Sequence, residues 1–198
     1  MHQIILNNED YSINEEDLPY LIVYKEKSGG SHFSITLVVD LFKTGLKILF
    51  LTAFHMAKDN FLKQVGDDHS RISFVTNIDE LKKAKDNQCI ILESGNENLF
   101  TKATEELSDV DKRVILVKNI EAFSMKTFEH VLKLNKIILS GDIDNCVAKN
   151  EIIKKSWNSI VAFNKPETTL LIKIPILEKY NGYLSNKNKN GIIKIKTN

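Results

Sequence analysis

Cysteine is scarce in this sequence, and long hydrophobic runs are missing. Only two cysteines occur, Cys89 and Cys146, and their wide separation excludes both a disulfide framework and a zinc motif. Such low usage is typical of a reducing compartment. No apolar run approaches the ~18 residues that a membrane span needs, and the first residues show no signal-peptide pattern. We therefore expect a cytoplasmic protein that does not contact membranes.

Excess charge of either sign is also missing from the chain as a whole. The formal net charge is +1, which gives no overall basic field for binding nucleic acid. The charge is uneven, because nine lysines and three glutamates lie from Glu151 onward. Four of these lysines can contact nucleic acid phosphates or form a charged edge strand that resists aggregation. We favour the edge strand for these four: Lys187, Lys189, Lys194 and Lys196.

Short apolar segments alternate with helical patterns along most of the chain. Buried strands are predicted at residues 20–24, 47–53, 71–75, 89–93, 113–117 and 136–140. Helices are predicted at residues 32–44, 56–65, 79–85 and 123–134, with one more ending near residue 108. Asn77 or Asp79 can cap the third helix, and Asn96 or Asn98 the fourth. Continuously apolar strands joined by helices indicate an α/β fold, a mostly parallel sheet with helices on both faces.

The pattern changes after Asp144. A helix is predicted at residues 150–156, followed by strands at 159–163, 168–174, 182–185 and 192–196. The last two strands flank an Asn-Gly pair, which is a strong hairpin signal. We therefore predict an antiparallel C-terminal extension at one edge of the sheet.

The chain shows no internal repeat and no low-complexity linker, so we predict a single domain, 1–198. Within it, residues 1–19 form an N-terminal arm or lead-in strand. Residues 20–145 form the parallel α/β core. Residues 146–198 form a C-terminal helix and antiparallel strands.

Residues 25–31, Lys-Glu-Lys-Ser-Gly-Gly-Ser, join the first core strand to the first helix. A strand, a glycine turn and a buried helix form the geometry of a phosphate-binding loop. A complete loop reads Gly-x4-Gly-Lys-Ser/Thr, in which the lysine binds phosphate and the hydroxyl holds Mg²⁺. In the best alignment Tyr24 replaces the first glycine and Gly30 replaces the lysine, whereas Gly29 and Ser31 match. The loop therefore keeps its amides and hydroxyl and lacks its lysine.

Six residues of this loop and of the helix start are the candidate ligand-binding residues. They are Lys27, Ser28, Gly29, Gly30, Ser31 and His32. Lys25 or Lys27 can also reach the loop from its other side, although loops that place a lysine there keep the usual lysine as well.

The order of these elements resembles the core of RecA-like and KaiC-like ATPases over most of residues 20–197. The resemblance implies a catalytic glutamate after the second core strand and a Mg²⁺-binding aspartate after a later strand. Phe54 stands at the place of the glutamate, and Lys118 stands at the place of the aspartate. Glu93, at the end of another strand, is a rival candidate for the aspartate.

Three departures at mechanistic positions remove most of the electrostatic stabilisation on which phosphoryl transfer depends. We therefore predict a pseudo-ATPase that has no catalytic residue, metal or cofactor. The runs Gly30-Ser31 and Phe54-His55 resemble the small non-ATPase RecA-like subunits of the Elongator complex. This resemblance implies a scaffold subunit in a homo- or hetero-oligomeric ring or dimer, and contact with tRNA. The alternative is an atypical ATPase that binds ATP and Mg²⁺ through Lys25 or Lys27, Ser31 and Glu93.

Two histidines and a serine lie near the expected ligand edge. His32 and His55 can bind metal or phosphate as a pair, although we interpret them as ordinary loop residues. Ser31 beside a histidine does not indicate a serine hydrolase, because the Gly-x-Ser-x-Gly pattern is missing.

Charged residues follow the last two core strands. Asp142 and Asp144 come after the sixth strand, where ligands bind in open α/β sheets. We interpret them as the carboxylates of a polar turn. Lys118 and Glu121 can pair with each other or across a subunit interface. Trp157, just before a strand, is expected to pack in the core or at an edge.

Overall fold

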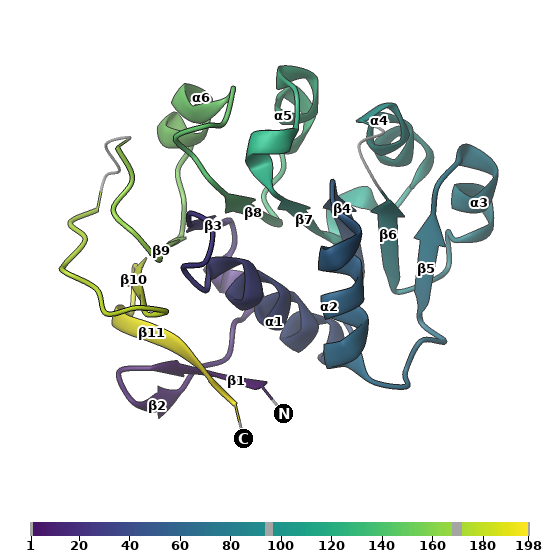
Figure 1. Ribbon diagram of the computed structural model, residues 1–198. Coiled ribbons are helices and arrows are strands. Elements are labelled where there is room, and N and C mark those ends of the chain that lie inside the picture. The colour runs from purple at the N-terminus through teal and green to yellow at the C-terminus, as the bar shows by residue number, and fades with distance from the viewer. Residues whose placement is uncertain (1, 94–96, 168–171, 198) are drawn as a thin grey trace.

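An 11-stranded sheet runs through the computed structural model, which describes residues 2–93, 97–167 and 172–197 (Figure 1). The strand order is β2-β1-β11-β10-β9-β3-β8-β7-β4-β6-β5. The parallel strands are β3 (Tyr20–Val23), β4 (Ile48–Thr52), β5 (Ile72–Val75), β6 (Cys89–Glu93), β7 (Val114–Lys118), β8 (Ile137–Gly141) and β9 (Ser159–Ala162). The antiparallel strands are β1 (His2–Leu6), β2 (Glu9–Asp10), β10 (Gly182–Asn186) and β11 (Asn190–Thr197).

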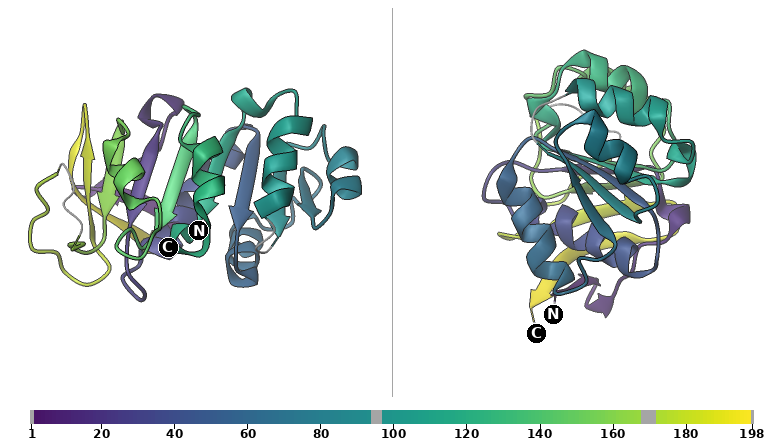
Figure 2. Two further views of the ribbon diagram at one scale, coloured as in Figure 1. Left: turned by 90° about the horizontal axis from the view of Figure 1, so that it is seen from above. Right: turned by 90° about the vertical axis from the view of Figure 1, so that its right-hand side faces the viewer.

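Helices cover both faces of the sheet (Figures 1 and 2). One face packs against α1 (Gly30–Lys43) and α2 (His55–Val65). The other face packs against α3 (Ile78–Lys83), α4 (Glu97–Glu106), α5 (Met125–Val131) and α6 (Lys149–Lys154). Short 3₁₀ turns lie at η1 (Glu15–Asp17), η2 (Val110–Lys112) and η3 (Ile120–Ala122). The predicted α/β fold with a mostly parallel sheet is confirmed.

The central elements are buried because their sequences are apolar on every side. In α1, Phe33, Leu37 and Leu41 lie in the core together with Ile35 and Val38. A helix that is apolar all round belongs in an interior. The strands β3, β4, β7 and β8 are likewise buried along their whole length. This is the environment expected for parallel strands that are covered on both faces.

Helix boundaries follow local capping more closely than apolar spacing. The Asn77 side chain accepts hydrogen bonds from the amides of Asp79 and Glu80, so the predicted cap of α3 is confirmed. The α4 helix begins at Glu97, so the prediction of Asn98 as its cap is wrong, and Asn96 lies outside the described residues. The predicted helix at 123–134 is shorter, because the Ser124 amide is bound by the Glu97 side chain and α5 begins only after it.

The C-terminal part differs from the prediction in two places. β9 runs parallel to β3, so the expectation of an antiparallel strand at 159–163 is wrong. The α6 helix joins β8 to β9 as a crossover, which lets the two strands point the same way. Of the strand predicted at 168–174, residues 168–171 lie outside the described residues, and residues 172–174 are irregular. The hairpin of β10 and β11 is confirmed.

The N-terminal arm is part of the sheet. β1 pairs with β11, which brings His2 opposite Thr197 and places the two ends of the chain side by side (Figure 1). Ile4 and Ile193 are buried on the α1 side of these strands. β11 therefore lies between β1 and β10, and the prediction that its lysines guard a sheet edge is wrong.

Both cysteines are buried and free. Trp157 packs against the α3–α6 side of the core, which confirms its predicted packing role. Among the described residues, no helix combines the length and apolar character needed to cross a membrane.

Candidate functional site

The candidate loop lies between β3 and α1, at the carboxyl edge of the parallel strands. Gly29 has a φ of 96°, a left-handed conformation that favours glycine, and its carbonyl accepts the first hydrogen bond of α1 from Phe33. The first amides of a helix have no partner within the helix, so they attract anions. Lys27 also has a positive φ, of 60°, and its side chain is exposed.

A cleft of about 590 Å³ opens over this loop. Its walls come from the loop itself and from the segments that follow β4, β7 and β8. Open α/β sheets bind ligands at this place, outside the carboxyl ends of their strands. The cleft is lined by Tyr24, Lys25, Glu26, Lys27, Ser28, Gly29, Ser31, Phe54, Asn119, Glu121, Asp142 and Asn145.

Lys118 supplies a positive charge directly beneath this cleft. It is the last residue of β7 and is only 2% exposed. Its Nζ lies 2.8 Å from Ser31 Oγ, 3.0 Å from Tyr24 Oη and 3.4 Å from Asn119 Oδ1. All three partners are neutral, and all three line the cleft. Lys118 therefore binds the loop hydroxyl, and of the two predicted pairings the one with Glu121 of the same chain is wrong.

Tyr24 explains why glycine occupies the usual position of the loop lysine. A Cβ atom on Gly30 would lie 2.6 Å from Tyr24 Cδ1, well inside van der Waals contact. The Tyr24 ring is buried, and its hydroxyl accepts a hydrogen bond from Lys118. Tyr24 therefore contacts two of the positions that depart from the family pattern, Gly30 and Lys118.

Lys25 is held at the rim of the cleft. Its Nζ lies 3.3 Å from Asp144 Oδ2, and its backbone amide donates to Asn164 Oδ1 at 2.8 Å. The hydrogen bond to Asp144 raises the pKa of Lys25 above its ordinary value. Asp144 also accepts from the Glu167 amide at 3.0 Å. These contacts tie the loop to the segments that follow β8 and β9.

The acidic residues after β7 and β8 stabilise turns. Glu121 Oε2 accepts from the Asp142 amide at 2.9 Å, and Asp142 Oδ1 accepts from the Asp144 amide at 3.0 Å. Gly141 has a φ of 153°, and a Cβ there would lie 2.7 Å from the Ile120 amide nitrogen. The predicted polar turn is thus observed. The described residues contain no group of three or more His, Cys, Asp or Glu side chains that could hold a metal ion.

Of the other residues expected near the loop, Phe54 lies beside the cleft, whereas His32 and Glu93 are placed elsewhere. Phe54 lines the cleft and is 52% exposed. His32 contacts His2, with ring centroids 4.6 Å apart, and burial lowers the pKa of His32. Glu93 ends β6, which is separated from β3 by β4, β7 and β8, and its side chain lies outside the described part of the structure.

Tyr180 forms a further wall beside the loop. It is 55% exposed, and its Cα would lie 3.4 Å from a Cβ on Gly29. A neighbouring hollow of about 440 Å³ is bounded by Tyr180, Ser28 and Phe163. Sequence reasoning missed Tyr180 because it lies far from the loop in the chain and outside any regular element.

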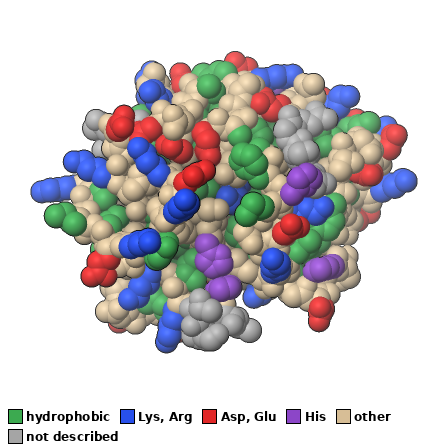
Figure 3. Space-filling model, in the orientation of Figure 1, with side chains coloured by type: hydrophobic (Ala, Val, Ile, Leu, Met, Phe, Trp, Pro, Cys, Tyr) green, Lys and Arg blue, Asp and Glu red, His purple; other side chains and the backbone are tan. Residues whose placement is uncertain are grey.

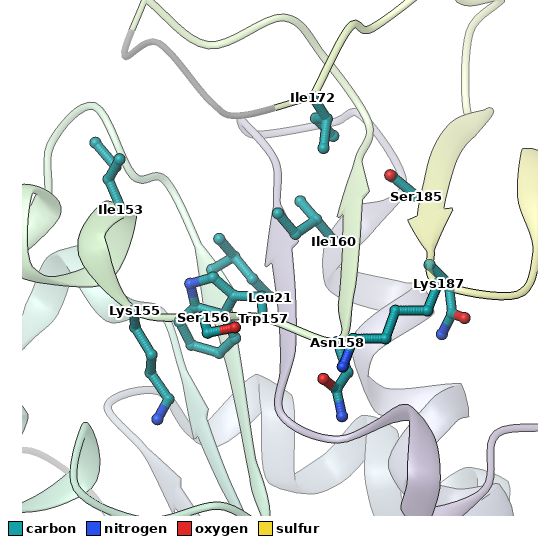
Figure 4. A pocket seen from close by; sticks show the side chains of 11 residues that line it. Leu21, Ile153, Lys155, Ser156, Trp157, Asn158, Ile160, Ile172, Ser185 and Lys187 are labelled. Carbon is teal, nitrogen blue, oxygen red and sulfur yellow. The ribbon is translucent and has the colours of Figure 1, made fainter.

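A separate cavity, of about 340 Å³, lies on the α6 side of the sheet near the amino end of β9 (Figure 4). Trp157 lies against Leu21 within it, and Lys155 points away from it (Figure 4). Lys155 donates to the carbonyls of Leu132 and Leu134, and Trp157 donates to Ile152. Because these polar groups already have structural partners, the cavity is a weaker candidate for a ligand site than the loop cleft.

No family model matches the sequence, and no curated protein matches it. Solved structures of a viral protein are similar to it. One is the genome packaging NTPase B204 from Sulfolobus turreted icosahedral virus 2 in complex with AMP. Its TM-score is 0.58 at 16% identity, over 93% of this chain and 98% of that chain. The same NTPase in complex with ATP-gammaS has a TM-score of 0.57 at 14% identity, with the same coverage.

A third similar structure is B204, described as the DNA-packaging ATPase from Sulfolobus turreted icosahedral virus. It has a TM-score of 0.56 at 14% identity, over 93% of this chain and 98% of that chain. The TM-scores establish a shared fold. Sequence identities this low do not establish a shared activity. The chain therefore has a P-loop NTPase-like fold.

Proposed function

We propose that this protein binds the phosphate groups of a nucleotide at residues 25–31, does not hydrolyse it, and acts by assembling with other protein subunits. The observation that carries the proposal is the 2.8 Å contact between Lys118 Nζ and Ser31 Oγ. Through this contact the Lys118 ammonium places a positive charge beside a loop that lacks its usual lysine. The sequence led us to expect no cofactor, and the position of Lys118 is our reason for proposing a bound nucleotide instead.

Tyr180 supports a nucleotide rather than a simple anion. Its exposed ring lies beside Gly29, and bases stack on aromatic side chains of this kind. The similar viral NTPase is described in complex with AMP and with ATP-gammaS. A phosphate on the loop and a base beside Tyr180 would occupy two adjacent hollows.

The acidic residues that would catalyse hydrolysis are replaced, and the two arginines are held in ion pairs. Phe54 and Lys118 stand where the resemblance implies acidic residues. The sequence contains two arginines, and both precede their strands, at the edge of the sheet opposite the loop. Arg71 binds Asp68 and Arg113 binds Asp109. A second copy of the chain would thus have no free arginine to stabilise a transferring phosphoryl group.

Exposed apolar side chains at the loop edge of the sheet support the assembly role. They follow the carboxyl ends of β4, β7 and β8, so they lie at the same edge as the loop. Exposed apolar groups of this kind mark protein interaction sites. These residues are Phe54, Met56, Met125 and Val147.

Binding without turnover is the test of this proposal. We expect calorimetry to give a dissociation constant for ATP on the order of 1–100 μM. Phosphate release should stay at the level of the buffer. Failure to bind ATP, ADP or tripolyphosphate under any condition would contradict the proposal. Sustained phosphate release that Lys118→Met abolishes would favour the alternative, an atypical ATPase.

Nucleic acid, including tRNA, is a second candidate ligand, through the β10–β11 hairpin. Lys194 and Lys196 lie on one face of β11. All four lysines of the hairpin are exposed: Lys187, Lys189, Lys194 and Lys196. Figure 3 shows acidic and basic side chains intermixed on the visible face, so any such binding would be local. Similar proteins are described as genome-packaging or DNA-packaging.

Salt dependence tests this second candidate. Replacing the four lysines by glutamine should weaken RNA or DNA binding by at least tenfold at low salt, and native binding should weaken steeply as salt rises. The readout is fluorescence anisotropy of labelled oligonucleotides at several salt concentrations. Equal binding by the native and substituted proteins would exclude the hairpin as the contact surface.

A further inference from the structure

The Lys118 ammonium lies in the interior without a carboxylate partner. Its three hydrogen-bond contacts are to neutral oxygens of Tyr24, Ser31 and Asn119. Within the described parts of the chain, no carboxylate lies at ion-pair distance from it. A buried charge that is not paired is costly, so proteins rarely keep one without a use.

A counter-charge can reach Lys118 from the cleft. All three partners of Lys118 line it, and Ser31 is exposed there. Ser31 Oγ is thus shared between the buried ammonium and any group that enters. An anion on the amides at the start of α1 would lie against this pair, where it would offset the charge of Lys118.

The same contact disfavours a divalent cation at Ser31 by charge repulsion. In a complete phosphate-binding loop the Ser or Thr hydroxyl coordinates Mg²⁺ at about 2.1 Å. Here that oxygen already accepts from Lys118 at 2.8 Å, so a metal ion on it would sit against a second positive charge. The nearby carboxylates of Glu121 and Asp142 accept hydrogen bonds from turn amides.

We propose that the Lys118 ammonium takes the place of the divalent cation, so that the loop binds nucleotide phosphates without metal. This inference rests on the proposed function, since it specifies how the phosphates are held there. The positive charge comes from β7 instead of from Mg²⁺, and it is built into the fold. Unlike a Mg²⁺ ion, the Lys118 ammonium cannot move with a transferred phosphoryl group or dissociate with the product. It therefore suits a nucleotide that stays bound and is not hydrolysed.

Calorimetry with ATP in EDTA and in excess Mg²⁺ is the direct test. We expect the two dissociation constants to agree within about threefold. A tenfold or greater gain from Mg²⁺ would overturn the metal-free inference and leave the proposed function standing. Failure to bind ATP in both conditions would overturn both.

Substitutions at Lys118 separate charge from packing. Lys118→Met should weaken ATP binding at least tenfold in both conditions. Lys118→Asp should abolish binding in EDTA and make it dependent on metal, with Mn²⁺ bound in the presence of ATP as seen by electron paramagnetic resonance. Lys136→Met removes a lysine at the opposite end of the neighbouring strand, where it pairs with Glu15, and should bind like the native protein. Melting curves check that each variant is folded, and native-like binding by folded Lys118→Met in EDTA would refute the proposal.

Discussion

Gly30→Lys should destabilise this protein by about 1–3 kcal/mol or more, although it restores the lysine of the common phosphate-loop motif. The reason is steric, because the new Cβ would lie 2.6 Å from Tyr24 Cδ1. The Tyr24 ring cannot retreat easily, since it is 5% exposed and its hydroxyl contacts Lys118 and Ser140. Urea denaturation monitored by circular dichroism measures the loss.

A double variant tests whether Tyr24 is the cause. Tyr24→Gly alone should cost about 3–5 kcal/mol, because it empties a packed aromatic site. Combined with Gly30→Lys, it should be more stable than the sum of the single effects predicts, by about 1–3 kcal/mol. Gly45→Lys is the control, because no atom lies within 4 Å of its Cβ position and only its φ of 90° opposes a side chain. That control should cost about 1 kcal/mol. Strict additivity of the two loop substitutions would refute the steric explanation.

Asp109→Ala should cost about 3–5 kcal/mol, since it leaves a buried guanidinium without its carboxylate. Arg113 is 0% exposed and donates to Asp109 Oδ1 at 2.9 Å and to the carbonyls of Asn87 and Lys85. These contacts join the start of β7 to the segment before β6. The free energy of unfolding in urea is the measurement.

Lys47→Met provides a matched control at the same carboxylate. Lys47 lies 2.7 Å from Asp109 Oδ2, but its side chain is 42% exposed. Exposed ion pairs contribute little, so this change should cost less than about 1 kcal/mol. If Lys47→Met and Asp109→Ala were equally destabilising, burial of Arg113 would not be the source of the effect.

The same carboxylate predicts how stability depends on pH. Partial burial acts to raise the pKa of Asp109, but the hydrogen bonds from Lys47 and Arg113 outweigh it and lower the pKa. A lowered folded-state pKa stabilises the native state above the unfolded value of about 3.9. This contribution should be lost as the pH falls through the folded pKa. Asp109→Ala should therefore show a weaker loss of stability below about pH 4 than the native protein.

Local patterns in the chain were sufficient to predict most elements of the fold. Continuous apolar runs predicted the six core strands, and Asn77 predicted the start of α3. Predictions failed where a partner distant in the sequence decided the outcome. The Glu97 side chain delays the start of α5, and β1 turns β11 from an edge strand into an internal one. The predicted direction of β9 was also wrong. Apolar content does not specify which way a strand runs, and the direction depends on pairing with β3, which is distant in the sequence.

The sequence predicted the loop of the candidate site but not the contacts that Lys118 makes with it. The motif alignment located Gly29 and Ser31 and revealed that the loop lysine is missing. In the sequence the replacements at Tyr24, Gly30 and Lys118 look like separate losses, since 94 residues separate Tyr24 from Lys118. A lysine at the end of a strand that should carry an acidic residue was the one available signal, and it did not show which group the lysine would contact.

The sequence by itself determined the fold class and the place of the loop, because apolar periodicity and glycine turns act through neighbours in the chain. Only the tertiary structure decided which charged side chain lies beside the loop. The order of the strands brings the end of β7 beside the start of α1, and there the Lys118 ammonium meets Ser31 at 2.8 Å. The contact depends on how the sheet assembles, and no local pattern encodes it.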